Sequence, residues 1–151
     1  MRGTILQVNI SPGGIPKLPI AEGRVGALGI EGDSCRNTKY HGGPKQALLL
    51  ISIEDIETLR RPGFPIEAGT LGENLTIQGI DMRAARIGDR FQAGEVILEI
   101  TKPRQPCKTL DQVRPGIQKE LTSGKGGFYA SVLKGGLIRP GDIIAKVDHD
   151  V

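Results

Sequence analysis

The residues with the greatest chemical potential lie in one stretch, Lys102-Pro103-Arg104-Gln105-Pro106-Cys107-Lys108. Its two prolines fix their own φ angles and bias the residue before each of them away from helix. Three cations accompany Cys107, and neighbouring cations favour the thiolate, which is the reactive form of a cysteine. The stretch therefore indicates a nucleophile or a soft metal ligand at Cys107, with a buried structural cysteine as the alternative.

The composition is that of one soluble globular domain spanning residues 1–151. Hydrophobic residues make up 38% of the chain and charged residues 25%, which is too apolar for a disordered protein. Aromatic residues are only 3%, and 17 acids nearly balance 20 bases, so we expect no nucleic-acid partner. No apolar run approaches the ~18 residues of a membrane span, and two cysteines are too few to staple a secreted domain. We therefore expect a cytoplasmic protein with no membrane partner.

Short apolar segments between frequent glycines and prolines predict a mainly β fold. Strands are expected over residues 4–10, near 20–28, and over 46–51, 75–77, 87–91, 95–101 and 143–147. Ser52 and Asp55 form a capping-box pattern that begins a helix ending before Pro62, and Pro115 could open a short helix over 116–121. Residues 128–133 fit a strand or a helix. The expected fold is a closed or nearly closed β-barrel with about two short helices and no strand–helix alternation of the parallel-sheet kind.

A long polar, glycine-rich segment, Gly29 to Pro44, separates the early strands from the apolar run at 46–51. Long ordered loops in small domains are usually functional. No P-loop and no G-x-G-x-x-G is present, so nucleotide binding of those types has no support.

Several short motifs resemble, in order and spacing, the MOSC domain, from about Gly29 to Asp142. They are His41-Gly42-Gly43-Pro44, Gly72-Glu73-Asn74-Leu75, Ile87-Gly88-Asp89, Pro103-Arg104-x-Pro106-Cys107, Gly127-x-Tyr129 and Gly141-Asp142. This domain forms the C-terminal part of molybdenum-cofactor sulfurases and occurs in mitochondrial amidoxime-reducing enzymes and small bacterial proteins. The resemblance implies a β-rich barrel. It also implies that the motif cysteine is a thiolate ligand to molybdenum in reductase members, or a proposed persulfide carrier in sulfur-transfer members.

Molybdenum cofactor (molybdopterin with its metal) is a dithiolene-bearing pterin with a phosphate, and the motif residues suit such a group. Thiolate is a soft ligand, so Cys107 would hold the metal. Arg104, Lys102 or Lys108 would meet the phosphate, although such charges can equally be solvated surface groups. Backbone N–H groups of Gly42 and Gly43 could turn toward the same anion.

Three further residues are candidates, each with an alternative structural role. His41 could bond the pterin or carry a proton, or it could tie down its loop. Asn74 suits a pterin edge, yet asparagine after a glycine turn often bonds its own backbone. Tyr129 could line the pocket or belong to the core. We expect Glu73 to anchor the long loop that ends at Pro44, and Asp89 and Asp142 to hold turns. No role transfers from the family to Cys35.

The leading interpretation is a molybdenum-cofactor oxidoreductase that reduces small N-hydroxylated substrates, with Cys107 on the metal. One alternative is a sulfur carrier with a persulfide on Cys107, and another is a non-catalytic carrier of the pterin cofactor. No pyridoxal-phosphate domain and no flavin, haem or iron–sulfur motif is evident. Separate electron-donor proteins, or a sulfur donor for the carrier, are therefore the expected partners.

Overall fold

The computed structural model describes residues 1–34, 43–60, 63, 66–105, 116 and 126–148. Its strands are β1 (Arg2–Ile10), β2 (Leu18–Ile20), β3 (Gly23–Gly26), β4 (Gly29–Ile30), β5 (Leu48–Ser52), β6 (Leu75–Gln78), β7 (Arg90–Ala93), β8 (Val96–Pro103), β9 (Phe128–Lys134), β10 (Gly136–Ile138) and β11 (Ile143–Val147). The helical elements described are α1 (Ile53–Arg60) and two 3₁₀ turns, η1 (Pro44–Gln46) and η2 (Met82–Ala84).

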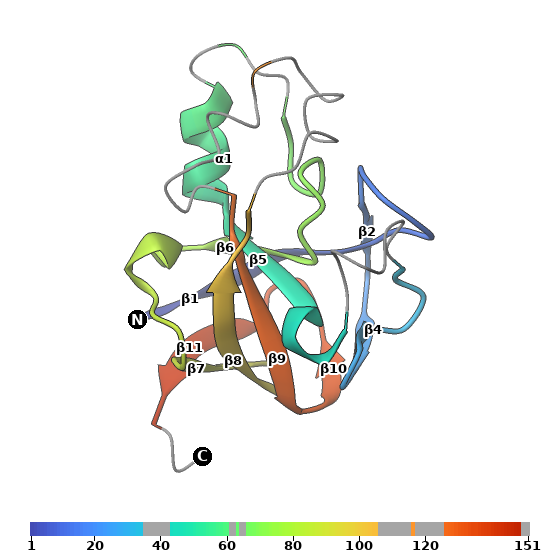
Figure 1. Ribbon diagram of the computed structural model, residues 1–151, viewed down its shortest axis with the longest axis vertical. Coiled ribbons are helices and arrows are strands. Elements are labelled where there is room, and N and C mark those ends of the chain that lie inside the picture. The colour runs from blue at the N-terminus through green and yellow to red at the C-terminus, as the bar shows by residue number, and fades with distance from the viewer. Residues whose placement is uncertain (35–42, 61–62, 64–65, 106–115, 117–125, 149–151) are drawn as a thin grey trace.

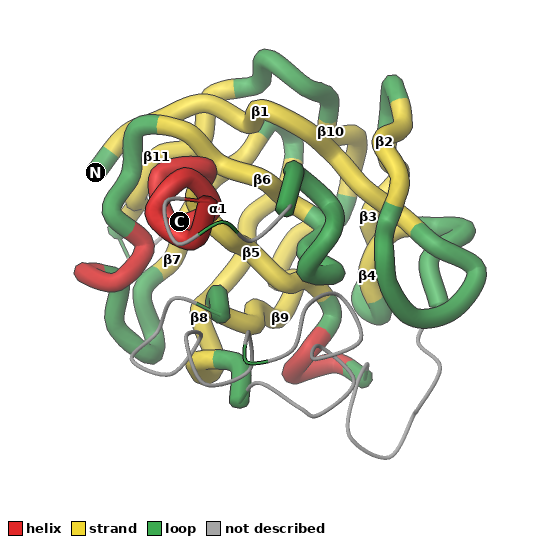
Figure 2. The backbone as a smooth tube through the Cα atoms, turned by 90° about the horizontal axis from the view of Figure 1, so that it is seen from above, coloured by secondary structure: helices red, strands yellow, loops and turns green. Residues whose placement is uncertain are grey.

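Seven strands close into a barrel in the order β11-β7-β8-β9-β5-β6-β1, because β1 also pairs with β11. Strand β2 extends the sheet beyond β1, and β10, β3 and β4 form a small second sheet beside it (Figure 1). Seen from above, the strands run around the wall of the barrel, with α1 over one side (Figure 2). The predicted mainly β, closed barrel is confirmed.

One pair of wall strands is parallel, contrary to the expectation that no strand–helix alternation of this kind occurs. Strand β5 runs parallel to β6, with Leu50 opposite Leu75, and α1 provides the crossover between them. The other barrel pairings are antiparallel. A parallel pair needs a long crossover connection, usually a helix, and the segment from Ile53 to Asn74 supplies it.

Neighbouring side chains of β5, all of them buried, belong to two different apolar clusters. In β5, Leu48 and Leu50 belong to the large cluster inside the barrel. Ile51 belongs instead to a smaller cluster with Ile56 and Leu59 of α1. Successive strand side chains point to opposite faces of a sheet, so α1 covers part of the outer face of β5.

The predicted helix after residue 52 is confirmed as α1, and its cap is formed as expected. The backbone N–H of Asp55 donates to the Ser52 hydroxyl at 3.2 Å. The second expected helix, 116–121, lies outside the described residues except for Gly116. Residues 128–133 form a strand. The region near 20–28 contains the last residue of β2 and all of β3, which pair in different sheets.

Both aspartates expected to hold turns do so. Asp89 accepts a hydrogen bond from the N–H of Arg86 at 2.9 Å, and Asp142 accepts one from the N–H of Arg139 at 2.8 Å.

In the part of the chain that is described, no helix has both the length and the apolar character needed to cross a bilayer.

Candidate functional site

Three predicted site residues, Lys102, Tyr129 and Asn74, are brought to one level of the barrel wall. Lys102 of β8 is the register partner of Tyr129 in β9, and Tyr129 is the partner of Leu49 in β5. Asn74, directly before β6, exchanges two bonds with Leu49: its N–H donates to the Leu49 carbonyl at 2.9 Å, and its Oδ1 accepts from the Leu49 N–H at 3.0 Å. We call Lys102, Tyr129, Leu49 and Asn74 the cross-strand row.

The row lies on the outer face of the barrel. Phe128 and Ala130, which flank Tyr129, belong to the inner cluster, as do Leu48 and Leu50 on either side of Leu49. Side chains between inward-facing neighbours point outward in a strand. Tyr129 and Leu49 are nevertheless only 7% and 4% exposed, so this outer face is itself covered.

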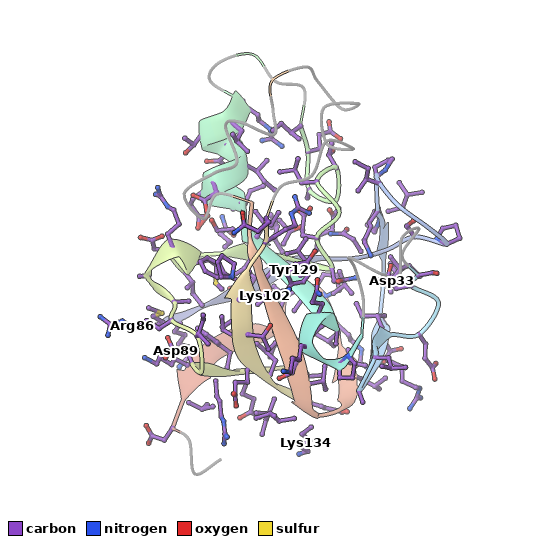
Figure 3. All side chains as sticks on the ribbon, viewed as in Figure 1. Asp33, Arg86, Asp89, Lys102, Tyr129 and Lys134 are labelled. Carbon is purple, nitrogen blue, oxygen red and sulfur yellow. The ribbon has the colours of Figure 1, made fainter. Side chains whose placement is uncertain are left out.

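Lys102 provides an exposed cation at one end of the row. Its Nζ lies 5.9 Å from the centroid of the Tyr129 ring, within the range of a cation–π contact. Figure 3 shows the two side chains together near the same end of β8 and β9, with Lys134 at the opposite end of β9. The ring therefore helps to hold an ammonium group at a fixed place on the outer face.

Asn74 uses both amide hydrogens within the protein. They donate to the Asn9 carbonyl at 3.2 Å and to Oδ2 of Asp33 at 2.8 Å. The side chain thus links β1, β5 and the segment after β4, which is a positioning role at the edge of the site. As far as the described residues go, these bonds leave the second lone pair of Oδ1 for a ligand.

Asp33 is central to the polar network around Asn74, and the sequence analysis did not single out its side chain. Its carboxylate contacts Lys17 Nζ at 2.6 Å and accepts from the Ser11 N–H at 3.0 Å. Lys17 and Asp33 are 11% and 13% exposed, so the ion pair is largely buried. The sequence gives little indication of this role for Asp33, because an aspartate that follows a glycine is typical of a turn.

Arg104 is buried against the turn that precedes β6 and is 8% exposed. Its Nη1 donates to the carbonyl of Leu71, and its backbone N–H donates to the Gly127 carbonyl at 2.9 Å. Gly72 has φ +90°, and a Cβ there would lie 3.7 Å from Nη1 of Arg104 and 2.8 Å from the Ile15 side chain. Glycine is required at this position because the positive φ and the close packing both disfavour a side chain.

Glu73 closes the same turn. Its Oε2 accepts from the Gly69 N–H at 3.0 Å and from the Thr76 hydroxyl at 2.8 Å. Burial raises the pKa of Glu73, while these hydrogen bonds and the positive charge of Arg104 act in the opposite direction.

The 3₁₀ turn η1, which follows Gly43, contacts β8 one residue before Lys102. Gly43, with φ +86°, precedes η1, and the Lys45 carbonyl of η1 accepts a hydrogen bond from the Thr101 hydroxyl of β8. His41, Gly42, Cys107 and Lys108 lie outside the described residues, as does Cys35. Among the residues that are described, no three His, Cys, Asp or Glu side chains gather in a way that could hold a metal ion.

Sequence comparisons place this fold among known proteins. The family profile described as the MOSC domain matches residues 37–145. YflK of Bacillus subtilis, which carries no assigned function in its name, is 35% identical over 119 residues, covering 74% of this chain and 52% of YflK. A protein named "Reductase" from Gibberella moniliformis is 28% identical over 131 residues, covering 82% of this chain and 23% of that protein. The chain thus spans about half the length of the first relative and less of the second.

A solved structure agrees with the sequence relatives. YiiM from Geobacillus stearothermophilus superposes with a TM-score of 0.80 at 29% identity, over 99% of this chain and 77% of YiiM. The profile match covers well over half of the chain and includes β5, β6, β8 and β9, which carry the cross-strand row. The chain belongs to the MOSC domain family.

Proposed function

We propose that this chain binds molybdenum cofactor and reduces small N-hydroxylated compounds, with Cys107 as the thiolate ligand to the metal. The observation that carries the proposal is the cross-strand row, because the candidate residues Lys102, Tyr129 and Asn74, far apart in the sequence, meet on one outer face of the barrel. A relative named as a reductase supports the reaction class.

The charges on this face fit an anionic group. Lys102 is exposed at the end of the row, whereas the nearby carboxylate of Asp33 is neutralised by Lys17 at 2.6 Å and Glu73 is fully buried. A phosphate approaching the row therefore meets an accessible ammonium group and no accessible carboxylate among these residues. Lys102 would hold the phosphate as a point charge, with Tyr129 restricting its position.

The remaining roles rest on sequence order. Cys107 follows Arg104 by three residues, and Arg104 is held by Leu71 and Gly127. His41 precedes Gly43 by two residues and is the candidate to carry a proton. Lys108 and the Gly42–Gly43 backbone would add further contacts to the anion.

The bound group would supply the electrons that cleave the N–O bond. In the overall reaction an N-hydroxylated compound takes two electrons and two protons, and yields the reduced nitrogen compound and water. The electrons come from a separate donor protein. The chain's own contribution is to bind and orient the cofactor through Cys107 and Lys102, and to deliver a proton through His41.

The test is expression of the parent chain, Cys107→Ala and Cys35→Ala in a host that makes molybdenum cofactor. Molybdenum and pterin per chain would be measured, followed by reduction of a hydroxylamine and an amidoxime with chemically reduced viologen. We expect cofactor and activity in the parent and in Cys35→Ala, and loss of both in Cys107→Ala. A parent chain that stays free of molybdenum, in a host that loads a control molybdenum enzyme, would contradict the proposal. A persulfide on Cys107 in that chain would then point to sulfur transfer.

A further inference from the structure

Strand β8 contains one extra residue, Thr101, directly before the exposed Lys102. Ile100 of β8 lies opposite Ala130 of β9. The next pair along the two strands joins Lys102 to Tyr129, so Thr101 has no register partner in β9. This is a β-bulge, and bulges are common beside functional sites because they redirect the side chain that follows them.

The bulge decides on which face of the barrel Lys102 lies. Ile100 is fully buried and belongs to the apolar cluster inside the barrel. Strict alternation would place Lys102 on the same inner face two residues later, where a charged side chain would be costly to bury. The extra residue moves Lys102 to the outer face, where its Nζ lies 5.9 Å from the centre of the Tyr129 ring (Figure 3). The contact between lysine and ring therefore depends on the bulge.

The Thr101 side chain joins a second segment to the bulge. Its hydroxyl donates a hydrogen bond to the carbonyl of Lys45 in η1. Ala47, which follows η1, donates its N–H to the carbonyl of Ala130 at 3.1 Å, so this segment is attached to both β8 and β9. Lys45 and Lys102, which are far apart in the sequence, are thereby held on adjoining segments.

The two lysines add positive charge to this part of the surface. Lys45 and Lys102 are both exposed, and none of the ion pairs among the described residues includes either of them. Like charges on adjoining segments repel each other and together attract an anion. A phosphate has several acceptor oxygens, so it can accept charge-assisted hydrogen bonds from two ammonium groups at once.

We propose that Thr101 is a positioning residue for an anion site formed by Lys102 and Lys45, and that this site takes the phosphate of the cofactor. The bulge places Lys102 on the outer face, and the Thr101 hydroxyl holds the Lys45 segment beside it. The inference rests on the proposed function for the identity of the bound group, whereas the anion site itself can be tested without the cofactor.

The test titrates the chain without cofactor with inorganic phosphate, and NMR follows the side-chain ε-methylene signal of Lys102. In the parent, we expect the ring current of Tyr129 to displace this signal and phosphate to move it further. Thr101→Val keeps the β-branched shape and loses the hydroxyl, so phosphate should bind about threefold to tenfold more weakly, as for the loss of one charge-assisted contact. Thr101→Ser keeps the hydroxyl and should restore parental binding.

Three further variants test the second cation and the specificity of the effect. Lys45→Ala should weaken phosphate binding by a similar factor. Lys134→Ala, at the other end of β9, should leave it unchanged (Figure 3). Thr58→Val is the matched control for the lost hydroxyl, because Thr58 also donates to a backbone carbonyl, that of Glu54 at 3.0 Å, and it should bind phosphate as the parent does.

Parental phosphate binding in Thr101→Val or in Lys45→Ala would overturn the proposal. A Lys102 signal that phosphate does not move would also overturn it. The assay contains no molybdenum, so its result does not depend on whether the chain loads the metal. Failure of the proposed function, seen as a chain that stays free of molybdenum, is therefore distinguishable from failure of this inference.

Discussion

Most side chains inside the barrel and on the outer face around the cross-strand row are buried, Lys102 being the exposed member of the row, but the two regions are stabilised by different interactions. The inside is apolar, with fully buried residues such as Phe91, Leu98 and Ile77 from different strands. The outer face contains the buried polar residues Asn9, Glu73, Asn74 and Arg104 and the partly exposed Asp33, linked by directional hydrogen bonds and charge. In an apolar core, the cost of a substitution rises gradually with the change in side-chain volume. In a buried polar network, removing one partner leaves another polar group without its hydrogen bond, and the cost is large. The apolar interior therefore stabilises the fold, and the outer face holds polar groups in fixed positions that a binding site can use.

The largest expected loss of stability comes from removing a large side chain inside the barrel. Phe91→Ala removes a fully buried ring of β7 and leaves a cavity, so it should lower the free energy of unfolding by about 3–5 kcal/mol. Urea denaturation measures the change. Ile87→Ala is the matched control, because Ile87 is 68% exposed, and it should cost less than about 0.5 kcal/mol. Equal losses in the two variants would contradict the assigned inner face.

The next effect comes from breaking the polar network at its ion pair. Asp33→Ala leaves Lys17 buried without its partner and removes the acceptor of Asn74, so we expect a loss of about 3 kcal/mol. The control is Glu22→Ala, which breaks an exposed pair with Arg139 and should cost about 0–1 kcal/mol. If Asp33→Ala were as mild as the control in urea titrations, the outer face would not depend on the network.

We expect Glu73 to have a smaller effect on stability, and this effect depends on pH. Its raised pKa means that the folded chain binds the proton more tightly than the unfolded chain does. This contribution to stability is fully present below the usual value of 4.5 and is lost as the pH rises through the folded pKa. Urea midpoints of the parent should therefore fall relative to those of Glu73→Gln as the pH rises. A constant difference between the two chains across that range would show that Glu73 has no shifted titration.

The barrel and its main helix are predictable from sequence because they depend on local patterns. Alternating apolar residues and glycine turns locate β1, β7, β8 and β11, and the Ser52–Asp55 cap locates α1. The parallel pairing of β5 with β6 is not local, since it depends on how the crossover packs against the outer face.

The candidate site is predictable only in part. Motif resemblance selected Tyr129 and Asn74, and the search for cations around Cys107 selected Lys102; the three share one level of the wall. Two contacts could not be predicted from residue spacing, because they join residues distant in the chain: the Lys17–Asp33 ion pair and the hydrogen bond from Arg104 to Leu71. For the same reason, the sequence analysis predicted that Arg104 would bind a phosphate and did not predict that the turn before β6 would bind its guanidinium.

The most direct test of the account compares two lysines on the same pair of strands. Lys102 lies over Tyr129 at the row, and Lys134 lies at the other end of β9 (Figure 3). Lys102→Ala and Lys134→Ala would be loaded with molybdenum cofactor, and the pterin retained after dilution would be measured by fluorescence. The account predicts about tenfold weaker retention for Lys102→Ala, as expected for the loss of a charge-assisted contact to phosphate, and parental retention for Lys134→Ala. Equal retention by the two variants would contradict the claim that the outer face of the barrel binds the cofactor.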